Sequence, residues 1–351
     1  MFRQLFSFIL IFSVAAPNVS TQQSTVRIID HPRDNEWEIV IGPIDLPVMD
    51  EMMGHGMAGM PSPPVVTVPL PFDASVYGIR YVILDGEGNE LPTEILHHLN
   101  VVDPSYVELF HPIARRMAAA GSETGSPTLP WFLFGYPVKQ DQEVAVSATL
   151  HNPTGVEHND VTVRFFMKYV KGGRPWPLFD VFPFHIDVAY GIIDRSFDIP
   201  PGESTVSFET SPAIAGRIMG LGSHLHEYAT KIRFEDVTED RVIWEAEPIL
   251  AEDGSLDLAP VARLYWKFGV KVYPDRVYRA SVTYDNPTGE TIPSGGMGVV
   301  AGVFIPKDAD AWPTADTTDS VYVADLNHYL GLDKNQPTDS MPMGMDHSQG
   351  H

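Results

Sequence analysis

Two histidines separated by one residue form the most distinctive chemical feature of the sequence, in the segment GSHLHE at positions 222–227. In a β-strand, side chains two positions apart point to the same face. His224 and His226 would therefore present two imidazoles side by side, which is a suitable chelate for copper or zinc. The apolar–polar pattern of the following ATKIRF segment favours a strand here. The alternative is a pair of histidines on an exposed face.

Three further residues could complete metal sites. His97 and His98 are adjacent in EILHHLNVV, and neighbouring strand residues point to opposite faces, so they can share a metal only if the backbone bulges or one ring reaches around. His151 ends a strand just before an Asn-Pro-Thr-Gly turn, where a lone histidine is usually structural. Met297 follows two glycines and is a core residue unless its thioether binds copper.

Two other segments combine methionine and histidine with glycine. Thioethers suit Cu(I) and imidazoles suit Cu(II), so both segments are predicted to bind auxiliary copper. For the second segment, the alternative is a disordered polar tail. The residues concerned are Met52, Met53, His55, Met57 and Met60 in the first segment, and Met341, Met343, Met345, His347 and His351 in the second.

Composition excludes several classes of protein. There is no cysteine, which rules out disulfides, zinc–thiolate sites, iron–sulfur clusters and cysteine nucleophiles. The net charge of −23 argues against a nucleic-acid partner and disfavours an anionic membrane surface, whereas it weakly favours cations. The chain contains no serine-hydrolase elbow, phosphate loop or nucleotide fingerprint.

The elements that must position these residues are predicted to be strands. Short alternating or β-branched runs recur between turn residues, such as VYGIRYVILDG, DVTVRFFMKYV and RVYRASVTYDNPTG, which predicts an all-β fold. The runs VAVSATLHNPTG (144–155) and YRASVTYDNPTG (278–289) echo each other and favour two similar β-sandwich domains. A short helix or two turns is expected within Val107–Ala120, and a linker within Gly172–Phe184.

The N-terminus has the pattern of an export signal. Arg3 precedes an apolar run of 12 residues, Leu5–Ala16, which is too short to span a bilayer and is followed by a polar stretch. A buried N-terminal strand or helix is the alternative. The resulting prediction is an exported bacterial protein, periplasmic or extracellular, because a eukaryotic secreted chain of this size usually carries disulfides. The predicted organisation is a signal peptide (1–22), an N-terminal β-sandwich (24–175), a C-terminal β-sandwich (184–310) and a tail (311–351).

The order of these residues resembles that of the copper type II, ascorbate-dependent monooxygenases, which include peptidylglycine α-hydroxylating monooxygenase and dopamine β-monooxygenase. The resemblance covers about residues 36–308 and implies two jelly-roll-like antiparallel β-sandwich domains with one copper each facing a cleft. It assigns one copper to His97, His98 and His151. It assigns the other to His224, His226 and Met297, which would be the catalytic residues that activate O2. Ascorbate or a similar reductant is implied as co-substrate.

This sequence departs from the peptide-amidating members of that family at the positions that grip the peptide. Gly222 stands where those enzymes carry an arginine, and Val299 and Ala301 stand where they carry an asparagine and a tyrosine. The family's disulfides are also absent. The resemblance therefore implies a neutral or apolar small-molecule substrate rather than a glycine-extended peptide.

Two functions from different classes follow from the sequence. One is a copper-dependent monooxygenase that inserts oxygen from O2 into an activated C–H bond. The other is a non-catalytic periplasmic protein that binds or delivers copper through the same residues. Turnover of O2 with reductant would distinguish them. His185 is expected to be structural, and Glu227 is expected either to face solvent or to orient a copper-bound imidazole.

Overall fold

A computed structural model describes residues 25–48, 65–173, 175–190 and 195–329 of the chain. The predicted export signal (1–22) and both segments rich in methionine and histidine lie outside these residues. Export and auxiliary copper binding therefore stay predictions. The exact domain boundaries also stay predictions.

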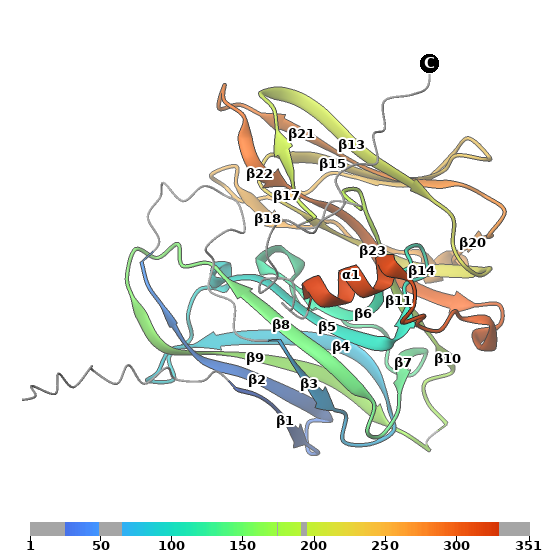
Figure 1. The fold of residues 1–351 in the computed structure, drawn as a ribbon, viewed down its shortest axis with the longest axis horizontal. Coiled ribbons are helices and arrows are strands. Elements are labelled where there is room, and N and C mark those ends of the chain that lie inside the picture. The colour runs from blue at the N-terminus through green and yellow to red at the C-terminus, as the bar shows by residue number, and fades with distance from the viewer. Residues whose placement is uncertain (1–24, 49–64, 174, 191–194, 330–351) are drawn as a thin grey trace, which may run out of the picture.

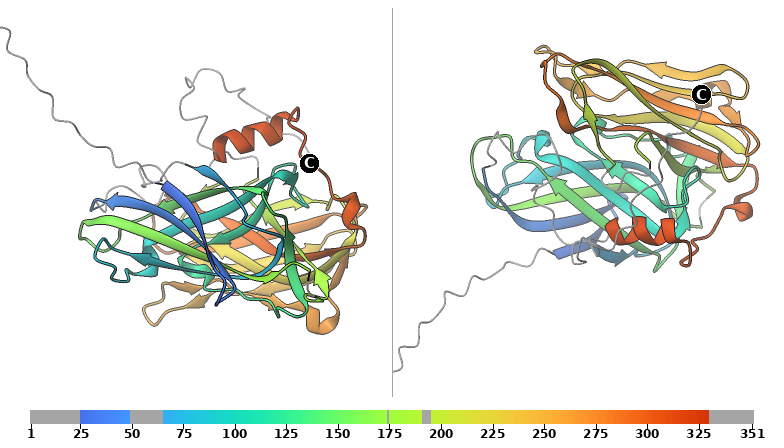
Figure 2. Two further views of the ribbon diagram at one scale, coloured as in Figure 1. Left: turned by 90° about the horizontal axis from the view of Figure 1, so that it is seen from below. Right: turned by 45° about the horizontal axis from the view of Figure 1, so that its top comes forward.

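The described part of the chain forms two β-sandwich lobes, so the predicted all-β class with two jelly-roll-like sandwiches is confirmed. Figure 2 shows the N-terminal lobe, in blue to green, against the C-terminal lobe, in yellow to orange. The first sheet of the N-terminal lobe has the order β1-β2-β9-β4-β7-β10, and only its β10–β7 pair is parallel. Its strands are β1 (Thr25–His31), β2 (Glu36–Leu46), β4 (Ala74–Leu84), β7 (Phe134–Val138), β9 (His158–Lys171) and β10 (Phe179–Asp180).

The second sheet of the N-terminal lobe has the order β3-β8-β5-β6. Its strands are β3 (Val66–Pro69), β5 (Leu96–Val107), β6 (Ala114–Ala120) and β8 (Glu143–Leu150). The two sheets enclose one apolar core in which Trp37 and Phe165 are fully buried. Two 3-10 turns, η1 (Thr93–Ile95) and η2 (Ser122–Thr124), flank β5 and β6.

The C-terminal lobe also contains two main sheets. The first has the order β11-β23-β14-β19, with β20 also paired to β14, and the second has the order β13-β21-β15-β16. The remaining strands form the pairs β12–β22 and β17–β18. The bounds are β11 (Phe182–Asp187), β12 (Phe197–Ile199), β13 (Gly202–Thr210), β14 (Gly216–Leu225), β15 (Ala229–Asp236), β16 (Arg241–Ala246), β17 (Ile249–Leu250), β18 (Leu256–Leu258), β19 (Ala262–Arg263), β20 (Val270–Val272), β21 (Tyr278–Asn286), β22 (Ile292–Gly296) and β23 (Gly298–Pro306).

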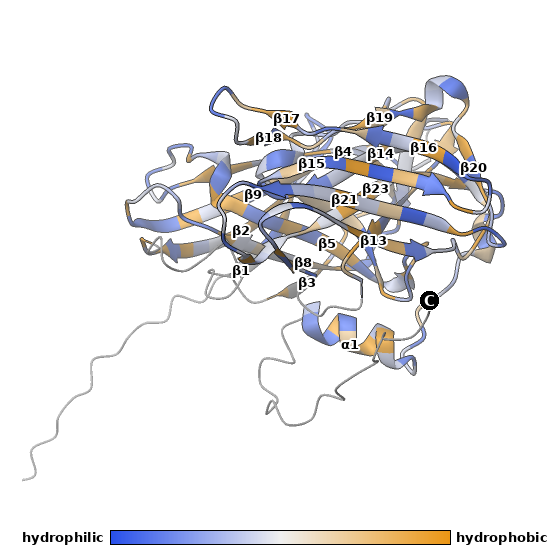
Figure 3. Cartoon of the chain, turned by 90° about the horizontal axis from the view of Figure 1, so that it is seen from above, coloured by the Kyte–Doolittle hydropathy of each residue, from blue (hydrophilic) through white to orange (hydrophobic). Residues whose placement is uncertain are grey.

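Alternation of side chains explains why these segments form half-buried strands. In β21, Tyr278, Ala280, Val282 and Tyr284 point inward and are fully buried, while the residues between them are more exposed. Figure 3 shows the matching alternation of hydrophobic and hydrophilic residues along the sheets of this lobe. The core they form also takes in Leu109 from the N-terminal lobe's β5–β6 connection. The lobes are thus joined by apolar packing.

The helix expected within Val107–Ala120 is absent. Residues 114–120 form β6, which pairs antiparallel with β5. Alanine and arginine favour helix locally, but the hydrogen bonds available along β5 and the helix-breaking Pro112 outweigh that preference. Arg115 is fully buried, and its guanidinium lies 4.4 Å from the ring centroid of Trp312.

The two Asn-Pro-Thr-Gly turns adopt the same local structure. The side-chain nitrogen of Asn152 donates to the carbonyls of Leu46 and Val156. The side-chain nitrogen of Asn286 donates to the carbonyls of Ile199 and Glu290 in the same way. In each turn the asparagine side-chain oxygen also accepts from the backbone and hydroxyl of the following threonine. The echo seen in the sequence is therefore a structural one.

The end of the described chain returns to the N-terminal lobe. After η3 (Leu264–Lys267) and η4 (Ala309–Ala311), the helix α1 (Ser320–Tyr329) packs beside β6 and β8 (Figure 1). Asp325 of α1 pairs with Arg116 at 3.2 Å and with Arg195 at 2.8 Å. The segment expected to be a linker runs between the lobes, since β10 pairs with β7 and β11 pairs with β23.

Candidate metal centre

A break in the register of β5 brings two adjacent histidines together. The pairing of β5 with β8 shifts between Leu96 and His98, which is the irregularity that a shared site for His97 and His98 requires. Their ring centroids lie 4.1 Å apart, and both residues are half-buried. Adjacent residues of a regular strand would point their rings to opposite faces of the sheet.

The second pair comes from the C-terminal lobe, at the end of β14. His224 is paired across the sheet with Val299 of β23, and His226 directly follows the strand. Their ring centroids are 5.0 Å apart. The second pair faces the first, with centroid separations of 4.8 Å for His98–His224 and 5.4 Å for His97–His226. We call His97, His98, His224 and His226 the histidine cluster.

Three members of the histidine cluster have converging ligand atoms. One ring nitrogen each from His97, His98 and His226 lies within 4.8 Å of the other two. In the described residues, the Nε2 atoms of His97 and His98 are buried and have no hydrogen-bond partner. The Nδ1 atom of His226 donates to the carbonyl of Gly295 at 3.0 Å, which leaves the lone pair on Nε2. All three rings can therefore supply a ligand nitrogen.

The fourth ring, His224, is held by a carboxylate. Its Nδ1 lies 2.5 Å from Oε1 of Glu123, which belongs to η2 and is buried. Burial alone would lower the pKa of His224, but the charge and hydrogen bond of Glu123 outweigh burial and raise it. Burial would raise the pKa of Glu123, whereas His224 lowers it. Sequence reasoning missed Glu123, because nothing in the SETGSP segment distinguishes it from any exposed acid.

His97 and His98 are held as neutral imidazoles by their burial. Burial, followed by the charge of His224, lowers the pKa of His97 to about 4, although Glu123 partly opposes this. Burial also holds the pKa of His98 well below its usual range. A neutral imidazole is the form that ligates a metal, so no proton has to be removed from these two rings at neutral pH.

The other predicted ligands are placed less directly. His151 accompanies the cluster closely enough for its charge to act on His97. Met297 is buried, and its backbone carbonyl and amide both hydrogen bond the hydroxyl of Tyr284. Glu227 accepts a hydrogen bond from the backbone of Leu256, which ties it to β18. The structure thus groups His226 with His97 and His98, across the two ligand sets that the family resemblance implied.

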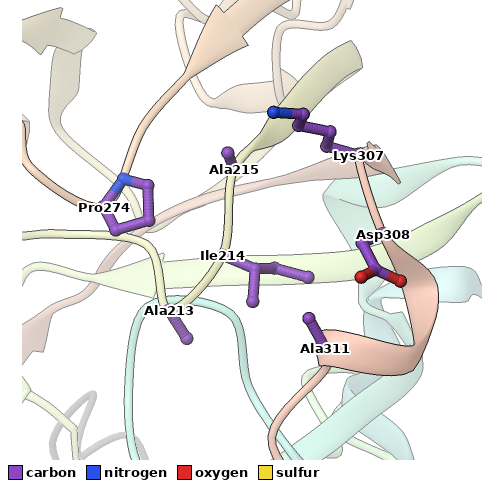
Figure 4. Close-up of a pocket in the computed structure, with 7 residues that line it drawn as sticks. All are labelled: Ala213, Ile214, Ala215, Pro274, Lys307, Asp308 and Ala311. Atoms are coloured by element: carbon purple, nitrogen blue, oxygen red, sulfur yellow. The ribbon is translucent and has the colours of Figure 1, made fainter.

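A surface hollow in the C-terminal lobe contains none of the predicted ligands. Figure 4 shows the hollow between the start of β14 and η4, with Lys307 and Asp308 as its only charged residues. The apolar remainder of the lining consists of Ala213, Ile214, Ala215, Pro274 and Ala311. No histidine of the cluster lines the hollow.

Comparisons with known proteins give structural similarities only. No family model matches the chain, and no curated protein matches it. Among solved structures, the major capsid protein P2 of bacteriophage PM2 matches with 8% identity and a TM-score of 0.33, covering 72% of this chain and 96% of that one. The STIV major capsid protein, from Sulfolobus turreted icosahedral virus, matches with 10% identity and a TM-score of 0.34, covering 70% and 93%. A PNGF-II structure matches with 9% identity and a TM-score of 0.35, covering 74% and 65%.

These comparisons correct the predicted family. The similar structures include viral capsid proteins, and neither a family model nor a curated protein supports a copper monooxygenase. The prediction of membership was therefore wrong, and the monooxygenase activity and the copper-handling alternative are both withdrawn. The expected ascorbate requirement and the expected substrate class depended on the family resemblance alone. Because the TM-scores are low, no function is carried over from the capsid proteins either.

The misleading pattern has a simple origin. The chain contains 13 histidines and 13 methionines, so single residues and dipeptides of the right type can fall into a family's order by chance. Only the arrangement of side chains distinguishes the two cases.

No helix among the described residues has the length and apolar character needed to cross a membrane.

Proposed function

We propose that this chain is a two-lobed β-sandwich protein with a structural role, in which one transition-metal ion bound by His97, His98 and His226 ties the lobes together. The convergence of three ring nitrogens within 4.8 Å, two from β5 and one from the end of β14, carries the proposal. The proposal assigns no reaction to the chain.

The donor set favours borderline metal ions. Three imidazoles suit zinc, copper, nickel and iron, whereas hard ions such as calcium prefer oxygen ligands. The general affinity order of divalent ions makes Cu²⁺ the tightest-binding ion in vitro. His224 lies beside these ligands and keeps its Nδ1 on Glu123. The backbone amide of His151 donates to the carbonyl of Ile95, two residues before His97.

The location of the ligands supports a structural role. A metal would satisfy the buried Nε2 atoms of His97 and His98, each of which otherwise costs about 1–3 kcal/mol as an unpaired polar group. It would also link a strand of the N-terminal lobe to a strand of the C-terminal lobe. An ion that binds only the folded chain adds about 2.7 kcal/mol of stability at a hundred times its Kd.

The test is metal titration of the full chain by calorimetry, together with thermal unfolding. The reference chain carries serine in place of the methionines and histidines of both predicted auxiliary segments, so that neither segment contributes ligands. The replaced residues are Met52, Met53, His55, Met57, Met60, Met341, Met343, Met345, His347 and His351. We expect one tight equivalent of Zn²⁺, Ni²⁺ or Cu²⁺ and a rise in Tm. Replacing His97, His98 and His226 with alanine should abolish both effects.

A matched control is available in the N-terminal lobe. His158 begins β9 and its Nε2 contacts the Thr154 hydroxyl, outside the histidine cluster. The variant His158→Ala should keep the tight equivalent and the rise in Tm. Retention of the tight equivalent in the triple alanine variant would refute the proposed site.

A further inference from the structure

The connection between β19 and β20 presents two large apolar side chains to solvent. Trp266 is 72% exposed and Phe268 is 82% exposed, which makes them the two most exposed large hydrophobic residues of the described chain. They flank Lys267, the last residue of the 3-10 turn η3, and Phe268 is the residue that caps this turn. We call residues 264–269 the aromatic loop. A soluble surface normally keeps such residues scattered and partly covered.

Hydrogen bonds and close packing fix the backbone conformation of the aromatic loop. The backbone amides of Phe268 and Gly269 donate to the carbonyls of Tyr265 and Leu264, each at 3.0 Å, and Arg217 donates to the Phe268 carbonyl at 2.8 Å. Gly269 sits against Ile218 so closely that an added Cβ would lie 2.6 Å from its carbonyl oxygen. The two exposed rings are thus held on a fixed turn.

The stretch of sequence that contains the aromatic loop is basic, unlike the chain as a whole. Residues 258–274 contain three cations, Arg263, Lys267 and Lys271, and no aspartate or glutamate, although the chain carries a net charge of −23. Arg217 lies across the sheet from Lys271. Within the described residues, none of these four cations forms an ion pair with an acidic side chain.

Ring contacts extend from the aromatic loop into the N-terminal lobe. Tyr265 contacts both Trp266 and Phe134, with centroids 4.8 Å and 5.5 Å away, and Phe134 contacts Phe179 at 6.1 Å. Phe179 is itself 49% exposed. Strand β10, which contains Phe179, and strand β20, which follows the aromatic loop, both lie at the right of Figure 1.

We propose that the aromatic loop binds the surface of an anionic phospholipid bilayer, with Trp266 and Phe268 in the headgroup region and Lys267 and Arg263 against the lipid charges. Tryptophan and phenylalanine beside lysine and arginine are the residues that bind such interfaces. The negative charge elsewhere on the chain is screened over about 10 Å of salt solution, so the local cations dominate at contact.

A bilayer fits this feature better than a second protein chain does. A stable protein interface buries about 800 Å² on each partner, over a complementary surface. Two rings projecting from one short turn offer a small convex tip, which a fluid headgroup layer can accommodate. Membrane binding is also independent of the proposed metal site, because no residue of the histidine cluster belongs to the aromatic loop.

The test is co-sedimentation of the full chain with vesicles. We expect binding to vesicles of phosphatidylcholine with 30% phosphatidylserine, weaker binding to phosphatidylcholine alone, and release at high salt. The double variant Trp266→Ser, Phe268→Asn should bind at least about tenfold more weakly. Asparagine is chosen because Phe268 has a φ of 60°, a conformation that asparagine tolerates. Lys267→Glu should also weaken binding, by about fivefold or more.

The matched control removes apolar surface elsewhere on the same lobe. Ile249 and Leu250 of β17 are 53% and 54% exposed, and the variant Ile249→Ser, Leu250→Ser should bind vesicles like the unaltered chain. Circular dichroism checks that each variant is folded. Absence of sedimentation with the anionic vesicles would overturn the proposal, as would an equal loss in both double variants. A concentration-dependent dimer that disappears in the Trp266→Ser, Phe268→Asn variant, without vesicle binding, would assign the loop to self-association instead.

Discussion

Buried histidines gather at two places between the lobes, and their surroundings differ. In the histidine cluster, one ring nitrogen from each of three histidines converges. Buried ring nitrogens without a hydrogen-bond partner occur at both places in the described residues: the Nε2 atoms of His97, His98 and His224 in the cluster, and the Nδ1 atoms of His111 and His185 at the other place. The second histidine pair, His111 and His185, has centroids 5.7 Å apart. There His111 accepts from the amide of Asp187 and stacks on Tyr190, while His185 lies 3.2 Å from Glu108. Burial of histidine alone therefore does not indicate a metal site, whereas convergence of ring nitrogens does.

The largest expected difference between the two places is in metal binding. Replacing His97 and His98 with alanine removes two of three ligands, so the tight equivalent of Zn²⁺ or Ni²⁺ should disappear from calorimetric titrations. The variant His111→Ala should retain metal affinity within about twofold if it is folded, since no ligand changes. Loss of the tight equivalent in His111→Ala would remove the distinction between the two places.

Stability of the metal-free chain should respond in the opposite way. His111 packs against Tyr190 and Phe208 in a buried site, so His111→Ala should lower the free energy of unfolding by about 2–4 kcal/mol. The variant His97→Ala should cost less than about 1 kcal/mol without metal, because it removes a buried nitrogen that has no partner. Urea unfolding measures both values. Equal losses would mean that the cluster packs as tightly as the second pair.

A third prediction separates His224 from its neighbours. In Glu123→Gln the carboxylate charge is lost, so burial is opposed mainly by the weaker charge effect of Asp187, and the pKa of His224 should fall by at least about one unit. The measurement is an NMR titration of the histidine Cε1–H signals in the metal-free chain. Glu227→Gln is the matched control, since Glu227 contacts Leu256, and it should leave the pKa of His224 unchanged.

The smallest expected effect is on the pH dependence of stability. Burial lowers the pKa values of His97, His98 and His111 below 6.5, so between about pH 6.5 and 4 the unfolded chain binds protons that the folded chain excludes. Their contribution is full above pH 6.5 and is lost as the pH falls, whereas His224, with a raised pKa, acts in the opposite sense. Between pH 6.5 and 5 the loss from His97 alone should be about 2 kcal/mol, and the opposite change at His224 reduces the net loss.

Urea midpoints between pH 7.5 and 5 measure this effect in the metal-free chain. The His97→Ala, His98→Ala variant lacks two of the three groups with lowered pKa values, so its stability should fall less steeply as the pH decreases. A steeper fall in the variant would contradict the assignment of neutral imidazoles to the folded cluster.

Local sequence patterns predicted much of the fold. Period-two alternation and turn residues predicted the all-β sandwiches, and the Asn-Pro-Thr-Gly repeat predicted two equivalent turns, because both depend on interactions within a few residues. The segment Val107–Ala120 was misjudged because pairing with β5, which depends on tertiary structure, overrides helix preference.

The candidate site was only partly predictable. His97, His98, His224 and His226 were identified from their spacing, and the structure brings their rings together. Their grouping was not predictable, because it depends on how β5 of one lobe meets β14 of the other. Glu123 was missed for the same reason, since 101 residues separate it from His224 in the chain. The family assignment relied on the order, spacing and strand context of a few residues, and neither a family model nor a curated protein supports it.

The docking of α1 has a consequence for the order of events during synthesis. The hydroxyl of Tyr329 hydrogen bonds the carbonyl of Asn100 and the Ser147 hydroxyl, residues that leave the ribosome 229 and 182 positions earlier. Tyr322 likewise fills an apolar site formed by Val102 and Ala145. The N-terminal lobe therefore emerges with this site uncovered and stays so until residues 320–329 have been made. Such a long-range closure has a high contact order, so α1 should be among the last elements to acquire protection from hydrogen exchange during refolding.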